Sequence, residues 1–201
     1  MGGIAIHAVC IHGRRARAGG GDFLLAAQLL GRAAERAGLH AQVRTPGWPK
    51  PPGAPDRAVA RISPAPFNDL DIPWRYHLEV AADPLLAVIP PLGNALLPGG
   101  RLLVNAPSLP RVPAGGPAAR SADLSALADR LGGLPGAALA AGAWAVLGEI
   151  GPGLPFDLAF VEEAVAAHDG GSLPLARAAF QLVRQACAAG RPETASPGGA
   201  A

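Results

Sequence analysis

Three arginines and three glycines stand close together near the N-terminus, in a loop that could bind an anion. They are Arg14, Arg15, Arg17, Gly19, Gly20 and Gly21. The loop joins an expected strand to an expected helix, where backbone N–H groups and the helix dipole attract phosphate or carboxylate groups. Guanidinium groups can add bidentate hydrogen bonds to such anions. The loop is therefore a candidate anion- or cofactor-binding site.

Asp22 supports the opposite interpretation of this loop. As the expected N-cap of the following helix, its carboxylate would accept from the free N–H groups of the first turn and would repel an anion. The glycines also lack the G-x-G-x-x-G spacing of dinucleotide-binding loops. The residues therefore favour a solvent-exposed connection, and contact with an anion or cofactor is the alternative.

A second candidate region is the loop 45–55, TPGWPKPPGAP, which contains five prolines. Proline has no backbone N–H, so this stretch can be neither a helix nor a central strand. Tryptophan combines a large apolar area with a polar N–H, and Trp48 here and Trp74 in a later loop both favour an interface. The candidate loop or interface residues are Trp48, Pro49, Lys50 and Gly53.

The other reactive side chains form no catalytic or metal-binding pattern. The five histidines are not paired at helical spacing, and no serine lies in a G-x-S-x-G elbow. Cys10 falls in an expected buried strand, which predicts an inert core thiol. Without a Cys-x-x-Cys pair, the chain alone can hold neither a four-cysteine iron–sulfur cluster nor a zinc ribbon. We expect no catalytic residue and no metal ligand in this chain.

The elements that must position these loops alternate between strands and helices in the first half of the chain. Strands are expected at 4–11, 39–44, 56–63 (half-exposed), 85–89 and 101–105, and helices at 23–37, 122–131, 135–147, 158–168 and 173–189. Asp157 and Ser172 are candidate N-caps, Gly38 is a helix stop, and 64–79 and 106–121 are expected connections. The pattern predicts an α/β fold of three layers, with a Rossmann-like sheet flanked by helices and a helix-rich C-terminal part. We expect one domain over 1–189 and a disordered tail over 190–201.

Composition narrows the class of partner. Lys and Arg total 17 and Asp and Glu 15, a net charge of +2 that is too balanced for a dedicated nucleic-acid binder. No apolar run reaches the roughly 18–20 residues that span a bilayer. The N-terminus lacks the charged start and cleavage site of a signal peptide. The expectation is a cytoplasmic protein that binds neither nucleic acid nor membrane.

A series of strings occurs in an order typical of one enzyme family. They are LLAAQLLGRAAERAGLHAQV at 24–43, the loop residues Pro49, Gly53, Ala54 and Pro55 with RIS at 61–63, DPLLAVI at 83–89, PGGRLLVN at 98–105, LGGLPGAALAAGAWAVLG at 131–148 and FVEEAVA at 160–166. Together, over residues 4–188, they resemble the gamma subunit or gamma domain of thiamine-diphosphate-dependent 2-oxoacid:ferredoxin oxidoreductases. This family includes the pyruvate and 2-oxoisovalerate enzymes.

The departures from that family fall on polar loop residues. Of the family's glycine loop, G-R-G-G-Q-G, only Gly19 and Gly20 keep their places, and Asp22 stands at the last glycine. Lys50 replaces an acidic residue of the second loop, and Gly136 replaces an asparagine. A change of substrate, or a role reduced to scaffolding, would both produce this pattern.

The resemblance implies a subunit of an enzyme that oxidatively decarboxylates a 2-oxoacid to an acyl-CoA. This chain lacks the G-D-G…N segment of thiamine-diphosphate enzymes and the cysteines of a cluster. Thiamine diphosphate, Mg²⁺ and iron–sulfur clusters are therefore expected on partner subunits of alpha, beta and delta type, with ferredoxin or a similar acceptor taking the electrons. This chain would contribute to assembly and to contacts with the 2-oxoacid or CoA, and it should be inactive alone. Two alternatives stay open: a stand-alone nucleotide- or anion-binding α/β protein, and a non-catalytic scaffold derived from the family.

Overall fold

The computed structural model describes residues 6–16, 21–45, 50–69, 71–87, 92–109, 118–151 and 153–189. Its strands are β1 (His7–Arg14), β2 (His40–Arg44), β3 (Pro55–Ser63), β4 (Tyr76–Ala81), β5 (Leu96–Asn105) and β6 (Ala118–Ala122). Its α-helices are α1 (Asp22–Arg36), α2 (Leu124–Leu131), α3 (Pro135–Ile150), α4 (Leu158–Ala166) and α5 (Leu173–Ala189), and single 3₁₀ turns cover Pro84–Ala87 and Gly170–Ser172. The expected tail, residues 190–201, lies outside the described residues.

The strands form one mixed sheet in the order β2-β3-β1-β4-β5-β6. Strands β1, β4, β5 and β6 run parallel to one another, whereas β3 runs antiparallel to both β1 and β2. From β1 the chain passes through α1 to β2, toward one edge of the sheet, and from β4 it passes to β5, toward the opposite edge. The carboxyl ends of β1 and β4 therefore meet where the strand order reverses.

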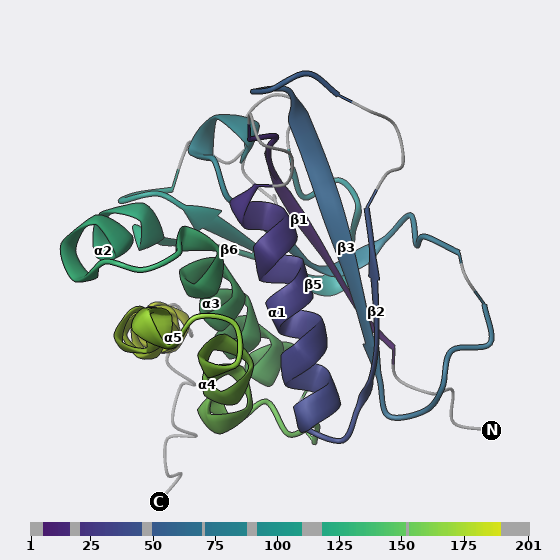
Figure 1. Ribbon diagram of the computed structural model, residues 1–201. Coiled ribbons are helices and arrows are strands. Elements are labelled where there is room, and N and C mark those ends of the chain that lie inside the picture. Colours follow the sequence, from purple (N-terminus) through teal and green to yellow (C-terminus); the bar gives the residue numbers. More distant parts are fainter. Residues whose placement is uncertain are drawn as a thin grey trace, which may run out of the picture.

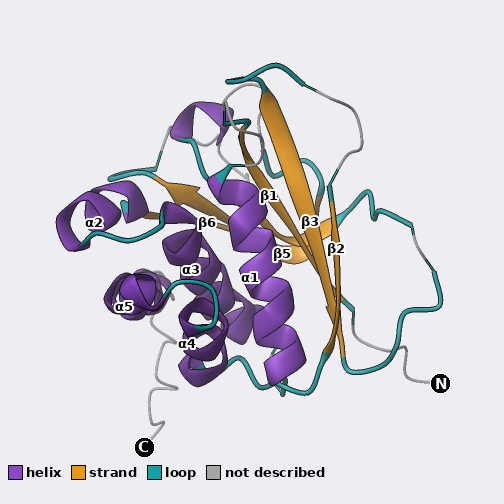
Figure 2. Ribbon diagram, viewed as in Figure 1, coloured by secondary structure: helices purple, strands orange, loops and turns teal. Residues whose placement is uncertain are grey.

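The helices gather on one side of the sheet (Figures 1 and 2). Helix α1 packs on β1, β2 and β3, and α3 packs on β4 and β5. Helix α4 packs outside them on α1 and α3, while α5 packs on α3 and on β6. The sheet, its inner helices and its outer helices form the three layers, which confirms the expected α/β class and helical C-terminal part. No helix in the described ranges is long and apolar enough to cross a membrane.

Helix α3 is the centre of the core. A helix that is apolar on all sides must be buried, and only its first residue, proline, and its last turn approach the surface. Trp144 is fully buried in it and packs edge-to-face on Phe156, with ring centroids 4.8 Å apart. The Trp144 indole N–H donates to the carbonyl oxygen of Asp157 at 2.8 Å. This bond ties α3 to the start of α4.

The opposite side of the sheet carries a second apolar cluster, and we call it the loop face. Its buried members come from four neighbouring strands, from the turn after β5 and from β6: Ala8, Cys10, Val59, Tyr76, Ala81, Leu96, Leu102, Val104, Ala106 and Ala119. Because both sides of the sheet are covered, β3 is almost entirely buried, and the expectation that 56–63 is half-exposed is wrong.

Three other expectations for the strands are wrong. Strand β4 begins inside the expected connection 64–79 and runs two residues past it, and β6 begins inside the expected loop 106–121 and ends one residue past it. The expected strand 85–89 begins instead in a 3₁₀ turn, Pro84–Ala87. The remaining residues of that range, 88–89, lie outside the described part of the chain.

The expected helix caps also differ from the structure. Asp22 is the first residue of α1 rather than its N-cap, which is Gly21. Asp157 does stand at the N-cap of α4, but its side chain makes no capping bond. The Ser172 hydroxyl accepts from the backbone N–H of Leu134 at 2.9 Å. Gly38, with a φ of +75°, ends α1 as predicted.

Candidate functional site

A small crevice lies where the carboxyl ends of β1 and β4 meet. Its volume is about 150 Å³, and its lining residues are Gly13, Arg14, Asp22, Phe23, Ala82 and Asp83. In open α/β sheets, ligands bind outside the carboxyl ends of the strands at the point where the strand order reverses. The first turn of α1 opens onto the same crevice and adds the positive end of a helix dipole.

Two glycines give the crevice its shape. A Cβ on Gly13 would lie 2.6 Å from the ring of Phe23, so the ring can pack here only on bare backbone. Gly21 has a φ of +148°, and a Cβ there would lie 2.6 Å from the carbonyl oxygen of Arg14. The predicted site residue Gly21 therefore lies directly against Arg14.

Arg14 is the cation of the crevice. Its Nε forms an ion pair with Asp83, and its Nη1 donates to the carbonyl oxygen of Gly53 at 3.1 Å. The Arg14 side chain is 40% exposed and that of Asp83 24%. A guanidinium has five N–H donors, so Arg14 keeps donors for a further anion.

Arg15 and Lys50 turn away to a buried carboxylate. Arg15 Nε lies 2.5 Å from one oxygen of Asp56, and Lys50 Nζ lies 3.2 Å from the other. Burial acts to raise the pKa of Asp56, but the Arg57 N–H, Arg15 and Lys50 together hold this pKa below its usual range. The Arg15 N–H also donates to the carbonyl oxygen of Ala54 at 3.1 Å. Arg15 therefore fastens the start of β3 to the end of β1, and Lys50 ties the segment before β3 to the same carboxylate.

Asp22 brings a negative charge to the crevice. Burial raises the pKa of its carboxyl group, and the backbone N–H of Gly136, in the first turn of α3, lowers this pKa in part. Asp22 thus interacts with the N-terminus of α3 instead of capping its own helix. Any anion in the crevice would have to approach from the side of Arg14.

Asn105, at the end of β5, braces the same edge of the sheet. Its Nδ2 donates to the Ala82 carbonyl oxygen at 2.9 Å and to Ser125 Oγ at 2.8 Å. Its Oδ1 accepts from the N–H groups of Leu124 and Ser125 at the start of α2. Sequence reasoning missed Asp83 and Asn105, although each is a polar residue at or just after a strand end.

The predicted site residues are thus partly brought together. Arg14, Gly21 and Gly53 meet at the crevice, while Arg15 and Lys50 lie behind it. The other candidates, Arg17, Gly19, Gly20, Trp48 and Pro49, lie outside the described residues. Across the described ranges, no three His, Cys, Asp or Glu side chains come together in a way that could hold a metal ion.

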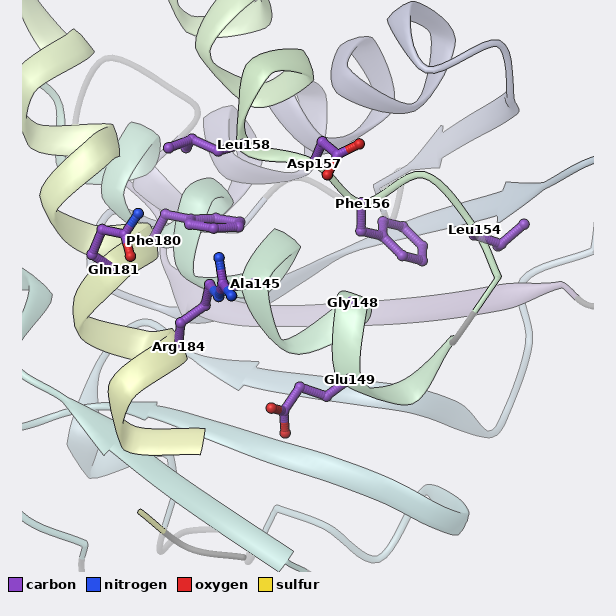
Figure 3. Close-up of a pocket in the computed structure, with 10 residues that line it drawn as sticks. All are labelled: Ala145, Gly148, Glu149, Leu154, Phe156, Asp157, Leu158, Phe180, Gln181 and Arg184. Atoms are coloured by element: carbon purple, nitrogen blue, oxygen red, sulfur yellow. The ribbon is translucent and has the colours of Figure 1, made fainter. Parts of the chain in front are cut away.

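A larger cavity of about 470 Å³ lies between α3, the start of α4 and α5 (Figure 3). The guanidinium of Arg184 lies 5.7 Å from the centroid of the Phe180 ring. The carboxylates of Glu149 and Asp157 belong to the same lining. These acids make the cavity a poor phosphate site, and the crevice remains the better candidate.

The order of strands and helices defines an α/β fold that is known from solved structures. The chain has the fold of the gamma subunits of 2-oxoacid:ferredoxin oxidoreductases. One such structure is the pyruvate oxidoreductase subunit PORC of Thermotoga maritima, with 22% identity and a TM-score of 0.67 over 90% of this chain and 96% of that one. No protein-family model and no curated protein matches the sequence.

Two further solved structures share the fold. The gamma subunit of a keto/oxoacid ferredoxin oxidoreductase from Geobacter sulfurreducens is 17% identical, with a TM-score of 0.70 over 92% of this chain and 98% of that one. The 2-oxoglutarate:ferredoxin oxidoreductase of Magnetococcus marinus, solved with 2-oxoglutarate, coenzyme A and succinyl-CoA, is 15% identical, with a TM-score of 0.66. The match covers 92% of this chain but 31% of that one, so there the fold is one part of a longer chain.

Proposed function

We propose that this chain is the gamma-type subunit of a multi-subunit, thiamine-diphosphate-dependent 2-oxoacid oxidoreductase. The enzyme would oxidatively decarboxylate a 2-oxoacid to an acyl-CoA and pass electrons to ferredoxin or a similar acceptor. The observation that carries the proposal is the end-to-end match in fold with two such subunits. The crevice at the strand reversal adds a place where this chain can meet a ligand.

In this role the chain binds and orients rather than carrying the redox chemistry. Thiamine diphosphate, Mg²⁺ and iron–sulfur clusters would lie on alpha-, beta- and delta-type partners. Both cysteines of this chain are buried, so neither is available to ligate an iron–sulfur cluster. Arg14 is the side chain that would meet a carboxylate of the 2-oxoacid or a phosphate of CoA, and the glycine loop that holds Arg17, Gly19 and Gly20 connects β1 to the crevice's helix.

Co-isolation tests the assembly. The tagged chain, produced together with the subunits encoded beside it, should purify with larger chains that contain thiamine diphosphate and clusters. The purified complex should turn over a 2-oxoacid with CoA. If the chain instead stays a monomer and binds a nucleotide or phosphate by itself, the stand-alone alternative is correct. If it joins an assembly without 2-oxoacid turnover, the scaffold alternative is correct.

Kinetics of the assembled enzyme test Arg14. Arg14→Ala should raise the KM for CoA or for the 2-oxoacid by about tenfold or more, because a charge-assisted hydrogen bond contributes roughly 1.5–3 kcal/mol. Arg177→Ala is the matched control, since it breaks an exposed ion pair with Glu162 far from the crevice. Unchanged KM values in an intact Arg14→Ala complex would remove the crevice from the ligand site.

A further inference from the structure

Trp74 is the most exposed of the large apolar side chains in the described part of the chain. It is 84% exposed, and Ile72 beside it is 37% exposed. Both lie in the segment that joins β3 to β4, which runs on the same side of the sheet as the loop face and away from the helices (Figure 1). An exposed tryptophan leaves a large apolar area in contact with water, and tryptophan is enriched at protein interfaces.

This segment is anchored, so the exposure of Trp74 is built into the fold. The buried guanidinium of Arg61 donates to both carboxylate oxygens of Asp69, at 2.5 and 3.1 Å, and to the carbonyl oxygen of Asp71 at 3.1 Å. The same guanidinium lies 4.7 Å from the centroid of the Phe67 ring. The chain is thus fixed at Asp71, three residues before Trp74, and presents the indole with little loss of entropy on binding.

Next to the indole lies a cation that has no acidic partner among the described residues. Arg57 lines a groove of about 610 Å³ together with Asp71, Ile72, Pro73 and Trp74. Its guanidinium forms no ion pair or hydrogen bond within the described residues, and Asp71 in the same groove does not pair with it. A half-buried cation of this kind gains stability when a carboxylate approaches and water is excluded.

One acid of the loop face, Glu79, is already occupied. Cross-strand pairing places His12 opposite Arg57, and Glu79 lies on the next strand. One Glu79 oxygen lies 3.1 Å from His12 Nε2, and the other accepts from the Gly93 N–H at 2.5 Å. Among the described residues, Arg57 is therefore left without an acidic partner and can receive one from another chain.

We propose that Arg57, Ile72 and Trp74 form a docking surface for a segment of a partner subunit that carries an acidic side chain beside an apolar one. The carboxylate would pair with Arg57, and the apolar side chain would cover the indole. This inference rests on the proposed function, since it names the surface by which this chain enters the assembly. Buried tryptophan and arginine are the side chains that most often dominate protein interfaces.

Affinity measurements on the reconstituted complex test the surface. Trp74→Ala and Arg57→Ala should each weaken association of this chain with its partner subunits by about tenfold or more, as interface hot spots do. Leu182→Ala and Arg130→Ala are the matched controls, because both side chains are exposed on the helical side, and their affinities should equal that of the unaltered chain. Circular dichroism checks that all four variants are folded.

Cross-linking identifies the occupant. A photoreactive phenylalanine derivative at position 74 should attach to a partner-subunit peptide that contains Asp or Glu. Attachment to a second copy of this chain would overturn the proposal, as would equal affinity of Trp74→Ala and its control. If the complex assembles normally with both variants, the proposed function stands and this docking surface is wrong. If the unaltered chain assembles with no partner, both are wrong.

Discussion

Asp56 is a residue whose charge holds together the back of the crevice. Its side chain is fully buried, and it receives Arg15 and Lys50 from two different segments. Removing a carboxylate from such a site leaves two cations without an acid, which costs more than the loss of a surface ion pair. Arg15 therefore has a structural role, whereas the adjacent Arg14 lines the crevice.

Asp56→Asn should therefore destabilise the protein, and the loss should depend on pH. The pKa of Asp56 is lowered in the folded state, so its contribution is complete above the unfolded value of about 3.9 and disappears as the pH falls through the folded value. We expect a loss of about 2 kcal/mol at neutral pH, shrinking toward zero in strong acid. Urea unfolding at a series of pH values from neutral to strong acid measures this loss of stability. Asp129→Asn, on the exposed side of α2, is the control; an equal loss at all pH values would contradict the argument.

At the scale of elements, helices were more predictable from the sequence than strands. Helix α5 occupies the expected range 173–189, and α1 is displaced from its expected range by a single residue, because an amphipathic period is local information. Strand β4 does alternate apolar and polar residues from Tyr76 to Val80, but it is only 6 residues long and begins three residues after Pro73, so the sequence predicts a connection there. The apolar run 85–89 misleads in the other direction, because it has the composition of a strand but begins in a turn.

The candidate site was predictable to the same extent as the elements that carry it. The order of strand, glycine loop and helix predicted that Arg14 and Gly21 lie between the first strand and the first helix; Gly21 does, whereas Arg14 is the last residue of β1. Asp83 could not be assigned there, because its position depends on β4 pairing with β1, which is distant in sequence. The geometry of Asp22, which faces α3, also depends on tertiary packing that no local pattern encodes.

Gly136 shows how tightly α1 and α3 meet behind the crevice. A Cβ at this position would lie 2.9 Å from the Asp22 carbonyl oxygen and 2.9 Å from the Leu25 Cβ. Gly136→Ala should therefore destabilise the fold by about 1 kcal/mol, because the cost of overpacking exceeds the gain in helix propensity. Gly148→Ala in the same helix is the control, since its Cβ would make an ordinary 3.5 Å contact with Phe156. Thermal unfolding of both variants measures this difference in stability. A stabilised Gly136→Ala would contradict the prediction and show that α1 and α3 can move apart.

At the scale of the whole molecule, the two candidate surfaces lie on different parts of the sheet. The crevice opens at the carboxyl edge, beside Arg14. The docking surface around Trp74 lies against the loop face, while the helices cover the opposite face. A partner seated at Trp74 would therefore leave the crevice edge open to a ligand. This separation suits the proposed role, in which the chain would join an assembly and contact substrate at once.

The same layout keeps the two cysteines apart and predicts that the purified chain binds no iron–sulfur cluster. Cys10 belongs to the apolar cluster of the loop face and Cys187 to the cluster beneath the helices, so the sheet lies between them. Burial raises the pKa of Cys10 to about 12 and also raises the pKa of Cys187, whereas cluster ligands must be thiolates. Anaerobic treatment with iron and sulfide should leave the desalted chain without cluster absorbance and without 2-oxoacid turnover. The Cys10→Ser, Cys187→Ser double variant is the control: stoichiometric iron held by the unaltered chain and lost in this variant would prove the prediction wrong.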